Sequence, residues 1–326
     1  MITLDKIKIV APLECVAVTK QDAFEVKIKN GEVISKSYTQ AKPYTLYVEV
    51  DYEAGETVIE FSGKILLDRY PELINKDNFN YCIERINAMG FCCIDTAMLY
   101  EHGRACVVDV TKDVRLQDAS GLSEWLRINI SNHRKYLARH IGSNLVIEKN
   151  VKTRGYKRRL TVYDKEKELQ RAENRDFISC LHDQDSLLSY FKGKVRFEFN
   201  FNSRQAIRET LNIEDTSIDE ILNSTANPIY NFIDEVITED SKEAGVELSW
   251  TDRKNLALLR DCDMDMAKVE AEIRKYASKG THISQVLKTY KALMSRLGEK
   301  GCYYKNSILG LLLETTVIFP LLLIWM

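Results

Sequence analysis

Residues 149–171, KNVKTRGYKRRLTVYDKEKELQR, carry the most information about the fold and chemistry of this chain. The stretch holds nine Lys and Arg residues against three acidic ones, inside a chain whose formal net charge is -2. Leu160-Thr161-Val162 forms a short β-like run that ends on Tyr163, and Asp164 stands where it would cap a following helix. The sequence therefore predicts a tyrosine at a strand-to-helix junction, flanked by cations that suit an anionic phosphodiester.

Upstream of this junction the first 65 residues are β-rich. Residues 24–29 alternate apolar and polar, and Asn30-Gly31 supplies the commonest two-residue hairpin turn. Residues 44–52 and 57–61 predict a second pair of strands. Residues 76–89 have apolar side chains at helical spacing, with Gly90 as the expected C-cap.

Downstream, strands are expected at 105–110, 158–163 and 195–201, with helical periodicity near 121–139 and 164–172. Strands separated by helices, with an early hairpin, indicate an α+β domain over residues 1–205. Residues 206–300 are predicted to form a mostly helical accessory region that binds DNA or a partner, followed by an apolar tail at 301–326. The helices are expected at 203–211, 216–223, 228–238, 251–260, 264–278 and 282–297.

Composition fits a globular protein with a real core, because 45% of the 326 residues are hydrophobic and 29% are charged. The net charge gives no global basic signature, so DNA binding would depend on local charge. Eight cysteines form no CxxC pair and five histidines complete no zinc-finger spacing, which favours reduced core cysteines in a cytoplasmic protein. The N-terminus, MITLDKIKIV, lacks the apolar core of a signal peptide.

The tyrosine needs help to act as a nucleophile, because a phenol with a pKa near 10 is unreactive at neutral pH. A metal ion or nearby cations would supply that help. Mg²⁺ and Mn²⁺ prefer oxygen ligands, and carboxylates are costly to bury without a partner. Four acids stand in short apolar strand-like runs and are the candidate ligands: Glu60, Asp109, Asp113 and Glu198. Asp109 and Asp113 are four apart, which on a continuous strand puts both on one face.

Each of these residues also has a simpler interpretation. Taken alone, Tyr163 is more often a core tyrosine, and an isolated acid usually faces solvent or pairs with an arginine, as Glu198 could with Arg196. The basic run 149–159 alone is more often a solvated hairpin. Spacing leaves these alternatives open, and the case for a catalytic site depends on the joint occurrence of the residues.

Four blocks, in order along the chain, resemble the motifs of rolling-circle replication initiators. RRLTVYDKEKEL resembles the nucleophile motif of staphylococcal small-plasmid initiators and of gene II-like phage replication proteins, with Tyr163 at the attacking tyrosine. TVIEFSGKIL resembles the upstream acid strand, CVVDVTKDV the strand with two acids, and KVRFEFNFNSRQA the strand after the tyrosine. The resemblance covers roughly residues 1–212. The chain has no His-hydrophobic-His motif, and the block around Glu60 is the weakest match.

The resemblance implies an antiparallel sheet with flanking helices that nicks origin DNA, single-stranded or in a hairpin. Tyr163 would form a 5′-phosphotyrosyl intermediate and leave a 3′-OH primer, with Lys165 assisting. Mg²⁺ or Mn²⁺ would be held by some of Glu60, Asp109, Asp113 and Glu198. A host helicase and a second copy of the chain are further candidate partners. The residues expected to bind DNA are Lys152, Arg154, Lys157, Arg158, Arg159 and Arg196.

Three other functions stay open from the sequence: a non-enzymatic DNA-binding regulator, a relaxase-like mobilisation protein with the same chemistry, and a membrane-tethered structural protein, which would depend only on residues 308–326. Residues 308–326 are apolar apart from Glu314, Thr315 and Thr316, and 19 residues are just enough to span a bilayer. A mid-segment glutamate is costly in hydrocarbon, so we expect no membrane span and a loosely attached apolar tail.

Overall fold

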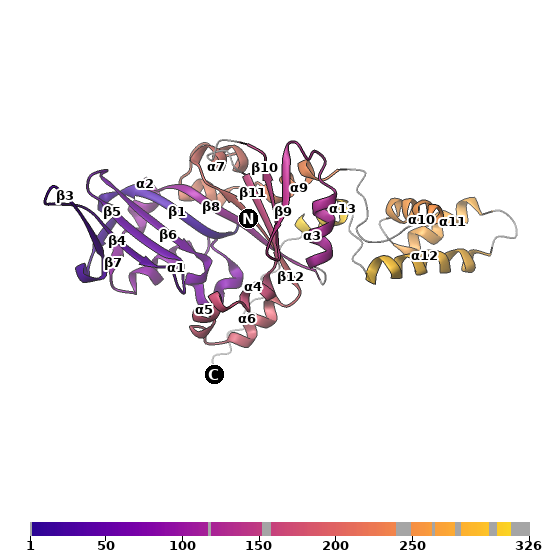
Figure 1. Ribbon diagram of the computed structural model, residues 1–326, viewed down its shortest axis with the longest axis horizontal. Helices are drawn as coiled ribbons and strands as arrows, with labels where there is room; N and C mark the ends of the chain where they lie inside the picture. Colours follow the sequence, from indigo (N-terminus) through magenta and orange to yellow (C-terminus); the bar gives the residue numbers. More distant parts are fainter. Residues whose placement is uncertain are drawn as a thin grey trace.

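The computed structural model describes residues 2–116, 119–151, 158–238, 249–262, 265–277, 282–299 and 305–313. Within these ranges, ten strands form one antiparallel sheet in the order β3-β4-β5-β6-β1-β8-β12-β11-β10-β9 (Figure 1). The strands are β1 (Leu4–Pro12), β3 (Glu25–Lys29), β4 (Glu32–Gln40), β5 (Leu46–Asp51), β6 (Glu56–Ser62), β8 (Arg104–Arg115), β9 (Tyr136–Ile141), β10 (Asn144–Lys149), β11 (Arg158–Asp164) and β12 (Lys194–Phe201). A separate pair joins β2 (Val16–Val18) to β7 (Cys92–Ile94).

One face of the sheet is apolar and carries the main core. On β8, for example, Val108, Val110 and Val114 are buried on this face, whereas Asp109, Thr111 and Asp113 alternate onto the other. Helices packed in the same core are α1 (Phe79–Asn87), α2 (Thr96–His102), α3 (Ala119–Ile128), α7 (Arg204–Leu211), α8 (Ile218–Asn223), α9 (Pro228–Val236) and α13 (Lys305–Leu313).

The other face of the sheet is polar and is partly covered by a small second core. This core includes Tyr70, Leu169, Phe177, Leu187 and Phe191. It is built from the segments η3 (Gly63–Glu72), α4 (Lys165–Leu169), η5 (Ala172–Asn174), α5 (Arg175–Ser179) and α6 (Gln184–Phe191). Because α4 follows β11 directly, the end of β11 lies beneath this cover.

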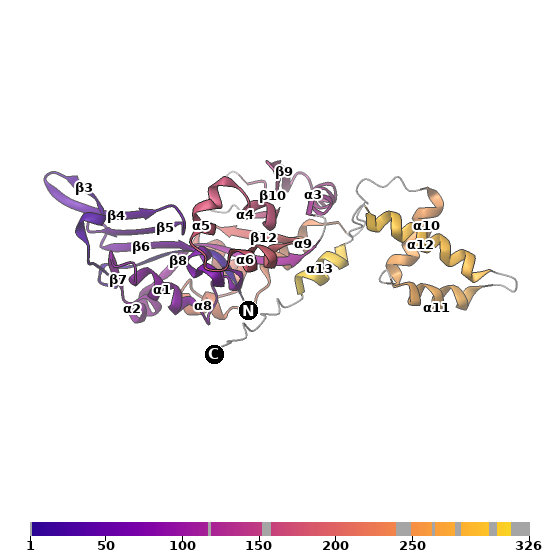
Figure 2. The same ribbon diagram turned by 90° about the horizontal axis from the view of Figure 1, so that it is seen from below.

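Three helices near the C-terminus have a core of their own. Leu256, Leu259, Val269 and Leu293 are buried among α10 (Trp250–Asp261), α11 (Met266–Tyr276) and α12 (Ile283–Glu299). Figures 1 and 2 show these helices beyond the end of the sheet that carries α3 and α13. They stand in the sequence between α9 and α13, which both pack on the sheet.

Helix α13 contains the start of the apolar tail, and it is packed tightly. Ile308 and Leu312 are buried against the apolar face, and the Lys112 Nζ and Asn227 Nδ2 groups donate to the Leu312 carbonyl at 2.6 and 3.0 Å. The described part of the tail is therefore firmly docked, which corrects the expectation of loose attachment. The rest of the tail, 314–326, lies outside the described residues. No helix in the described ranges is long and apolar enough to cross a membrane.

The α+β fold with an antiparallel sheet, flanking helices and a helical C-terminal region agrees with the sequence prediction. The Asn30-Gly31 turn has positive φ at both residues, and all six helices expected between 203 and 297 are present. One prediction was wrong: the helical periodicity assigned to 121–139 ends with α3, and residues 136–149 form the hairpin β9–β10 around Gly142, whose φ is +60°. Among the described cysteines none forms a disulfide; Cys93 and Cys180 are exposed, contrary to a core position.

Candidate active site

The strand register brings the predicted residues together on the polar face. Thr161 on β11 is the cross-strand partner of Glu198 on β12, and Tyr163 is that of Arg196. On the other side of β12, Arg196 faces Asp113 of β8, and Asn200 faces Asp109. Directly paired residues of antiparallel strands point to the same face, so Tyr163, Glu198, Asp109 and Asp113 share it.

Tyr163 lies at the predicted strand-to-helix junction. Asp164 caps α4 through a 3.0 Å hydrogen bond from the Lys167 backbone N–H, as the sequence predicts. The Tyr163 side chain is only 7% exposed, and its hydroxyl donates a 2.9 Å hydrogen bond to Oε2 of Glu198. Burial and the neighbouring Glu198 charge raise the pKa of Tyr163 well above its ordinary value. In this environment the phenol is neutral, and deprotonation needs an acceptor at hand.

Glu198 and Asp109 are two desolvated carboxyl groups with raised pKa values, so their ionised forms are destabilised at this site. Burial, together with the charges of Asp5 and Asp109, raises the pKa of Glu198 to about 7. Burial also raises the pKa of Asp109 to about 6, although its oxygen accepts a hydrogen bond from the Asn200 amide. Both carboxyls would be stabilised in their ionised form by a cation placed between them.

Arg196 is fully buried and holds several polar groups in place. Its Nε and Nη2 donate to the two Asp113 oxygens at 2.7 and 2.8 Å, and Nη1 donates to Asp5 at 2.7 Å. The same Nη1 donates to the Tyr70 hydroxyl at 2.6 Å, which in turn donates to Asp5. With 0% of its side chain exposed, Arg196 has no surface to offer a phosphate, which corrects its assignment to DNA binding. Asp113 is engaged in this ion pair.

Lys165 is also buried beneath the helical cover. Its Nζ lies 2.5 Å from Glu168 Oε2 and 5.7 Å from the centre of the Tyr163 ring. Burial and the nearby Arg196 charge lower the pKa of Lys165, while Glu168 acts in the opposite direction. The Lys165 amino group therefore lies near the Tyr163 ring, on the side covered by the small second core.

Glu60 stands apart from the other acids. It lies on β6, and its carboxylate is paired with Lys6 at 2.5 Å and Lys8 at 3.4 Å. In the described part of the chain, no group of three or more Asp, Glu, His or Cys side chains is arranged to hold a metal ion. Two of the four predicted ligands, Asp109 and Glu198, are desolvated and have raised pKa values. A pair of carboxylates suits Mg²⁺ or Mn²⁺, which commonly bind through one or two carboxylates plus water and substrate phosphate.

The predicted DNA-binding residues other than Arg196 fall into three groups. Lys152, Arg154 and Lys157 lie outside the described residues. Arg158 points to the apolar side and pairs with Glu209 on α7 at 3.1 Å. Arg159 is exposed and shares the face of Tyr163, since its cross-strand partner is Asn200.

Several residues of the site were not predicted. Asn200 continues the alternation of Arg196 and Glu198 along β12, so the period of two could have identified it. Asp5 reaches the site because the register of β1 on β8 shifts between Leu4 and Lys6, a bulge that turns Asp5 toward Arg196. Tyr70 and Glu168 arrive through tertiary packing, for which the sequence carries no local signal.

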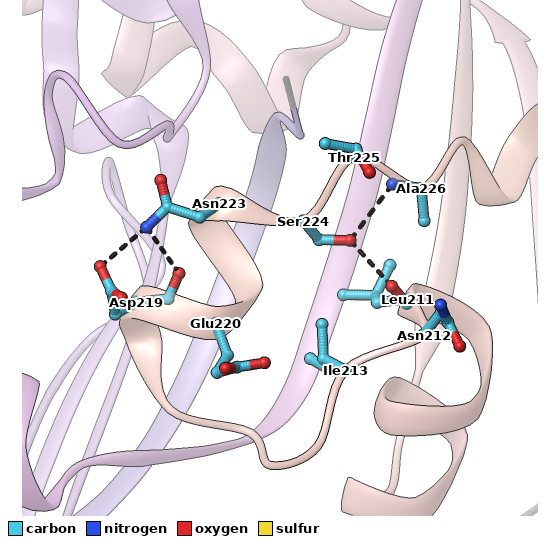
Figure 3. A pocket seen from close by; sticks show the side chains of 9 residues that line it. All are labelled: Leu211, Asn212, Ile213, Asp219, Glu220, Asn223, Ser224, Thr225 and Ala226. Carbon is cyan, nitrogen blue, oxygen red and sulfur yellow. Dashed lines mark hydrogen bonds between the residues drawn. The ribbon is translucent and has the colours of Figure 1, made fainter.

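A separate cavity lies away from this site and shares none of its residues. It has a volume of about 350 Å³ and is found between α7, α8 and the segment leading to α9 (Figure 3). Its lining includes the exposed carboxylates Asp219 and Glu220, and the Asn223 side chain donates to Asp219. The negative charge of this lining would disfavour a phosphate.

Comparison with known proteins gives one partial match, to a replication-associated family of phages. No curated protein and no solved structure matches the chain. Residues 79–220, which contain Tyr163, Glu198 and both acids of β8, match a family model of phages, described as the N-terminal part of the replication-associated gene II protein. The match concerns the phage type of initiator and does not extend to the plasmid type. Over these residues, less than half of its length, the chain is similar to this replication-associated family of phages.

Proposed function

We propose that this protein nicks replication-origin DNA through Tyr163, as a metal-dependent site-specific endonuclease and strand transferase that starts rolling-circle replication. The observation that carries the proposal is the 2.9 Å hydrogen bond from the Tyr163 hydroxyl to Glu198, within the region that matches the replication-associated family. A hydrogen bond between a nucleophile and a carboxylate with a pKa of about 7 is what general-base activation requires.

The reaction follows from these two side chains. The Tyr163 oxygen attacks the phosphorus of one phosphodiester while its proton passes to Glu198. The bond from phosphorus to the 3′ oxygen breaks, so the 5′ phosphate stays on Tyr163 and the leaving oxygen takes up a proton as a 3′-OH. That hydroxyl is a primer end for a polymerase. The phosphotyrosyl bond conserves the energy of the broken bond for rejoining.

A divalent cation would act beside this pair. Asp109 on β8 and Glu198 on β12 lie on the same face of the sheet and would hold Mg²⁺ or Mn²⁺. When bound, the ion would offset negative charge on the phosphate as it is attacked. Asp113 and Glu60 are engaged in ion pairs, so we assign them to the support of the site.

Lys165 would favour the phenolate form of Tyr163 from the covered side. Its Nζ lies over the Tyr163 ring and is fixed by Glu168, so its charge has a defined place near the developing anion. Arg196 acts in the same direction, since its charge lowers the pKa of Tyr163 against the effect of burial.

The test is covalent attachment of the purified protein to labelled single-stranded DNA carrying the origin of its own replicon, with Mg²⁺ or Mn²⁺ present. We expect a denaturant-resistant adduct that Tyr163→Phe abolishes. Tyr47→Phe is the matched control, because Tyr47 lies on the same face of the sheet, paired with Glu60, away from Glu198. An adduct formed equally by Tyr163→Phe would contradict the assignment, and Tyr156, outside the described residues, would be tested next. Binding without any adduct would indicate a DNA-binding regulator instead.

A further inference from the structure

The charge on the polar face of the sheet differs between the two sides of the site. On the side of β5 and β6, its outward residues include Glu49, Asp51 and Glu56, with Glu60 paired to lysines of β1. These acids would repel the phosphates of DNA. A strand of DNA that reaches Tyr163 is therefore expected to approach from the opposite side, over β11, β10 and β9.

That opposite side carries arginines on the same face as Tyr163. One row of cross-strand partners runs from Asp109 through Asn200 to Arg159, and on to Glu148 and Leu137. The neighbouring row runs from Glu198 through Thr161 and Val146 to Arg139. Arg139 is paired with Glu148 at 2.9 Å, yet 56% of its side chain is exposed.

The outer strand β9 also has exposed apolar side chains beside Arg139. Leu137 is 40% exposed and Ile141 is 49% exposed, and both alternate onto the face of Arg139. Among the described residues, β9 is the outermost strand at this end of the sheet. Arg171, which follows α4, donates to Ser143 and Asn144 and so ties the β9–β10 turn to the end of the Tyr163 strand.

The spacing of these residues suits one extended strand. Arg159 precedes Tyr163 by four residues on β11, which is about 13 Å at the rise of a β-strand. Arg139 lies two strands away from Thr161, or about 10 Å. Cations at such intervals contact phosphates a few nucleotides apart, while apolar side chains contact bases that are not paired.

We infer that the DNA strand attacked by Tyr163 lies as single-stranded DNA across β11, β10 and β9, with phosphates on Arg159 and Arg139 and bases on Leu137 and Ile141. The inference rests on the proposed function, since Tyr163 marks one end of the path. It adds a direction across the sheet and three β9 residues, Leu137, Arg139 and Ile141, that lie in none of the four sequence motifs.

The experiment measures equilibrium binding of a fluorescein-labelled single-stranded oligonucleotide by anisotropy, in EDTA and in the Tyr163→Phe background, where no nicking occurs. Arg139→Gln with Arg159→Gln should weaken binding about tenfold and reduce the slope of log affinity against log salt by about 1.4, since two phosphate contacts are lost. The matched control is Lys27→Gln with Lys29→Gln, which removes the same charge from β3 at the opposite edge. It should bind within about twofold of the parent.

A second pair of variants covers the case in which the loss of Arg139 disturbs Glu148. Leu137→Ser with Ile141→Ser leaves every charge in place and should weaken binding with an unchanged salt slope. The proposed path would be overturned if the Arg139/Arg159 variant and the Lys27/Lys29 variant lost the same DNA affinity. It would also be overturned if duplex DNA of the same sequence competed for the protein as well as the single strand does. If the wild type forms no covalent adduct but the β9 variants bind single-stranded DNA more weakly than the Lys27/Lys29 control, the DNA-binding surface is supported and the nicking function is not. If adducts form and the β9 variants bind like the parent, the path is wrong and nicking stands.

Discussion

Tyr163 and Glu198 are hydrogen-bonded across neighbouring strands although they are not direct cross-strand partners. Thr161 faces Glu198, and Tyr163 faces Arg196, so the 2.9 Å contact runs diagonally along the sheet. The diagonal leaves Arg196 free to engage Asp113 and Asp5 behind the pair. The proposed nucleophile and its proposed proton acceptor thus lie on adjacent strands of the sheet, with the buried ion pair of Arg196 and Asp113 beside them.

The first prediction concerns proton transfer. Glu198→Gln keeps the shape of the side chain and a hydrogen-bonding oxygen but removes the basic carboxylate. We expect nicking to fall by about 10² to 10⁴-fold, the usual contribution of a general base, with DNA affinity within about twofold. Single-turnover nicking of an origin oligonucleotide measures the rate, and anisotropy measures the affinity. A rate within about threefold of the wild type would exclude Glu198 as the proton acceptor.

The second prediction concerns metal binding. Asp109→Asn and Glu198→Gln should each weaken Mn²⁺ binding at least about tenfold, because each removes one of two carboxylate ligands. Glu60→Gln is the matched control, since Glu60 is engaged by Lys6 and Lys8 on the next strand. Isothermal titration with Mn²⁺ distinguishes them. If Glu60→Gln lost as much Mn²⁺ affinity as Asp109→Asn, Glu60 would also be a metal ligand, as the sequence analysis predicts.

The third prediction concerns pH in the absence of metal. The pKa of Glu198 is raised from 4.5 to about 7, and that of Asp109 from 3.8 to about 6. Between the unfolded and folded pKa values the folded state binds more protons than the unfolded chain. The free energy of unfolding therefore falls as pH rises from about 4 to about 7.

Urea denaturation in EDTA at pH 5, 6, 7 and 8 checks this. Glu198→Gln should flatten the pH dependence, because its amide does not titrate. Asp5 and Glu168 have lowered pKa values, so their contributions are lost only at still lower pH and do not obscure this window. A wild-type stability that rises between pH 5 and pH 7 would show that other groups dominate.

The fourth prediction concerns the buried ion pair. Arg196→Gln leaves Asp113 and Asp5 without their guanidinium partner in a buried setting, and such a loss costs about 3–5 kcal/mol of unfolding free energy. The matched control is Arg158→Gln, which breaks a more exposed pair with Glu209 and should cost less than about 1 kcal/mol. Urea denaturation of both variants gives the comparison. Equal losses would mean that the Arg196 network contributes no more than a surface ion pair.

The sequence predicted the local parts of this site and missed the long-range ones. The strand ending on Tyr163 and the cap at Asp164 follow from alternation and capping within a few residues. The position of Asp5 depends on a bulge between Leu4 and Lys6, and that of Tyr70 on a separate small core. Neither leaves a periodic trace in the sequence.

The hairpin β9–β10 was missed for a related reason. The helical spacing of Leu122, Trp125 and Leu126 is real and belongs to α3, but no proline marks where it ends. Gly142, at the turn between the strands, was the available signal.

The last prediction concerns the docked part of the tail. Leu312 is fully buried with Ile308 against Val114, Val195 and Phe197, directly behind the strands that carry the acids. Leu312→Ala should cost about 2–5 kcal/mol, the usual range for emptying a core leucine position. Leu313→Ala, one residue on, is the matched control, since Leu313 is 62% exposed and should change stability by less than about 0.5 kcal/mol. Truncation after residue 313 should keep nicking, whereas truncation after residue 304 removes α13 and should lower both stability and nicking. If the shorter chain unfolds at the same urea concentration as the longer one, α13 contributes nothing to the fold behind the site.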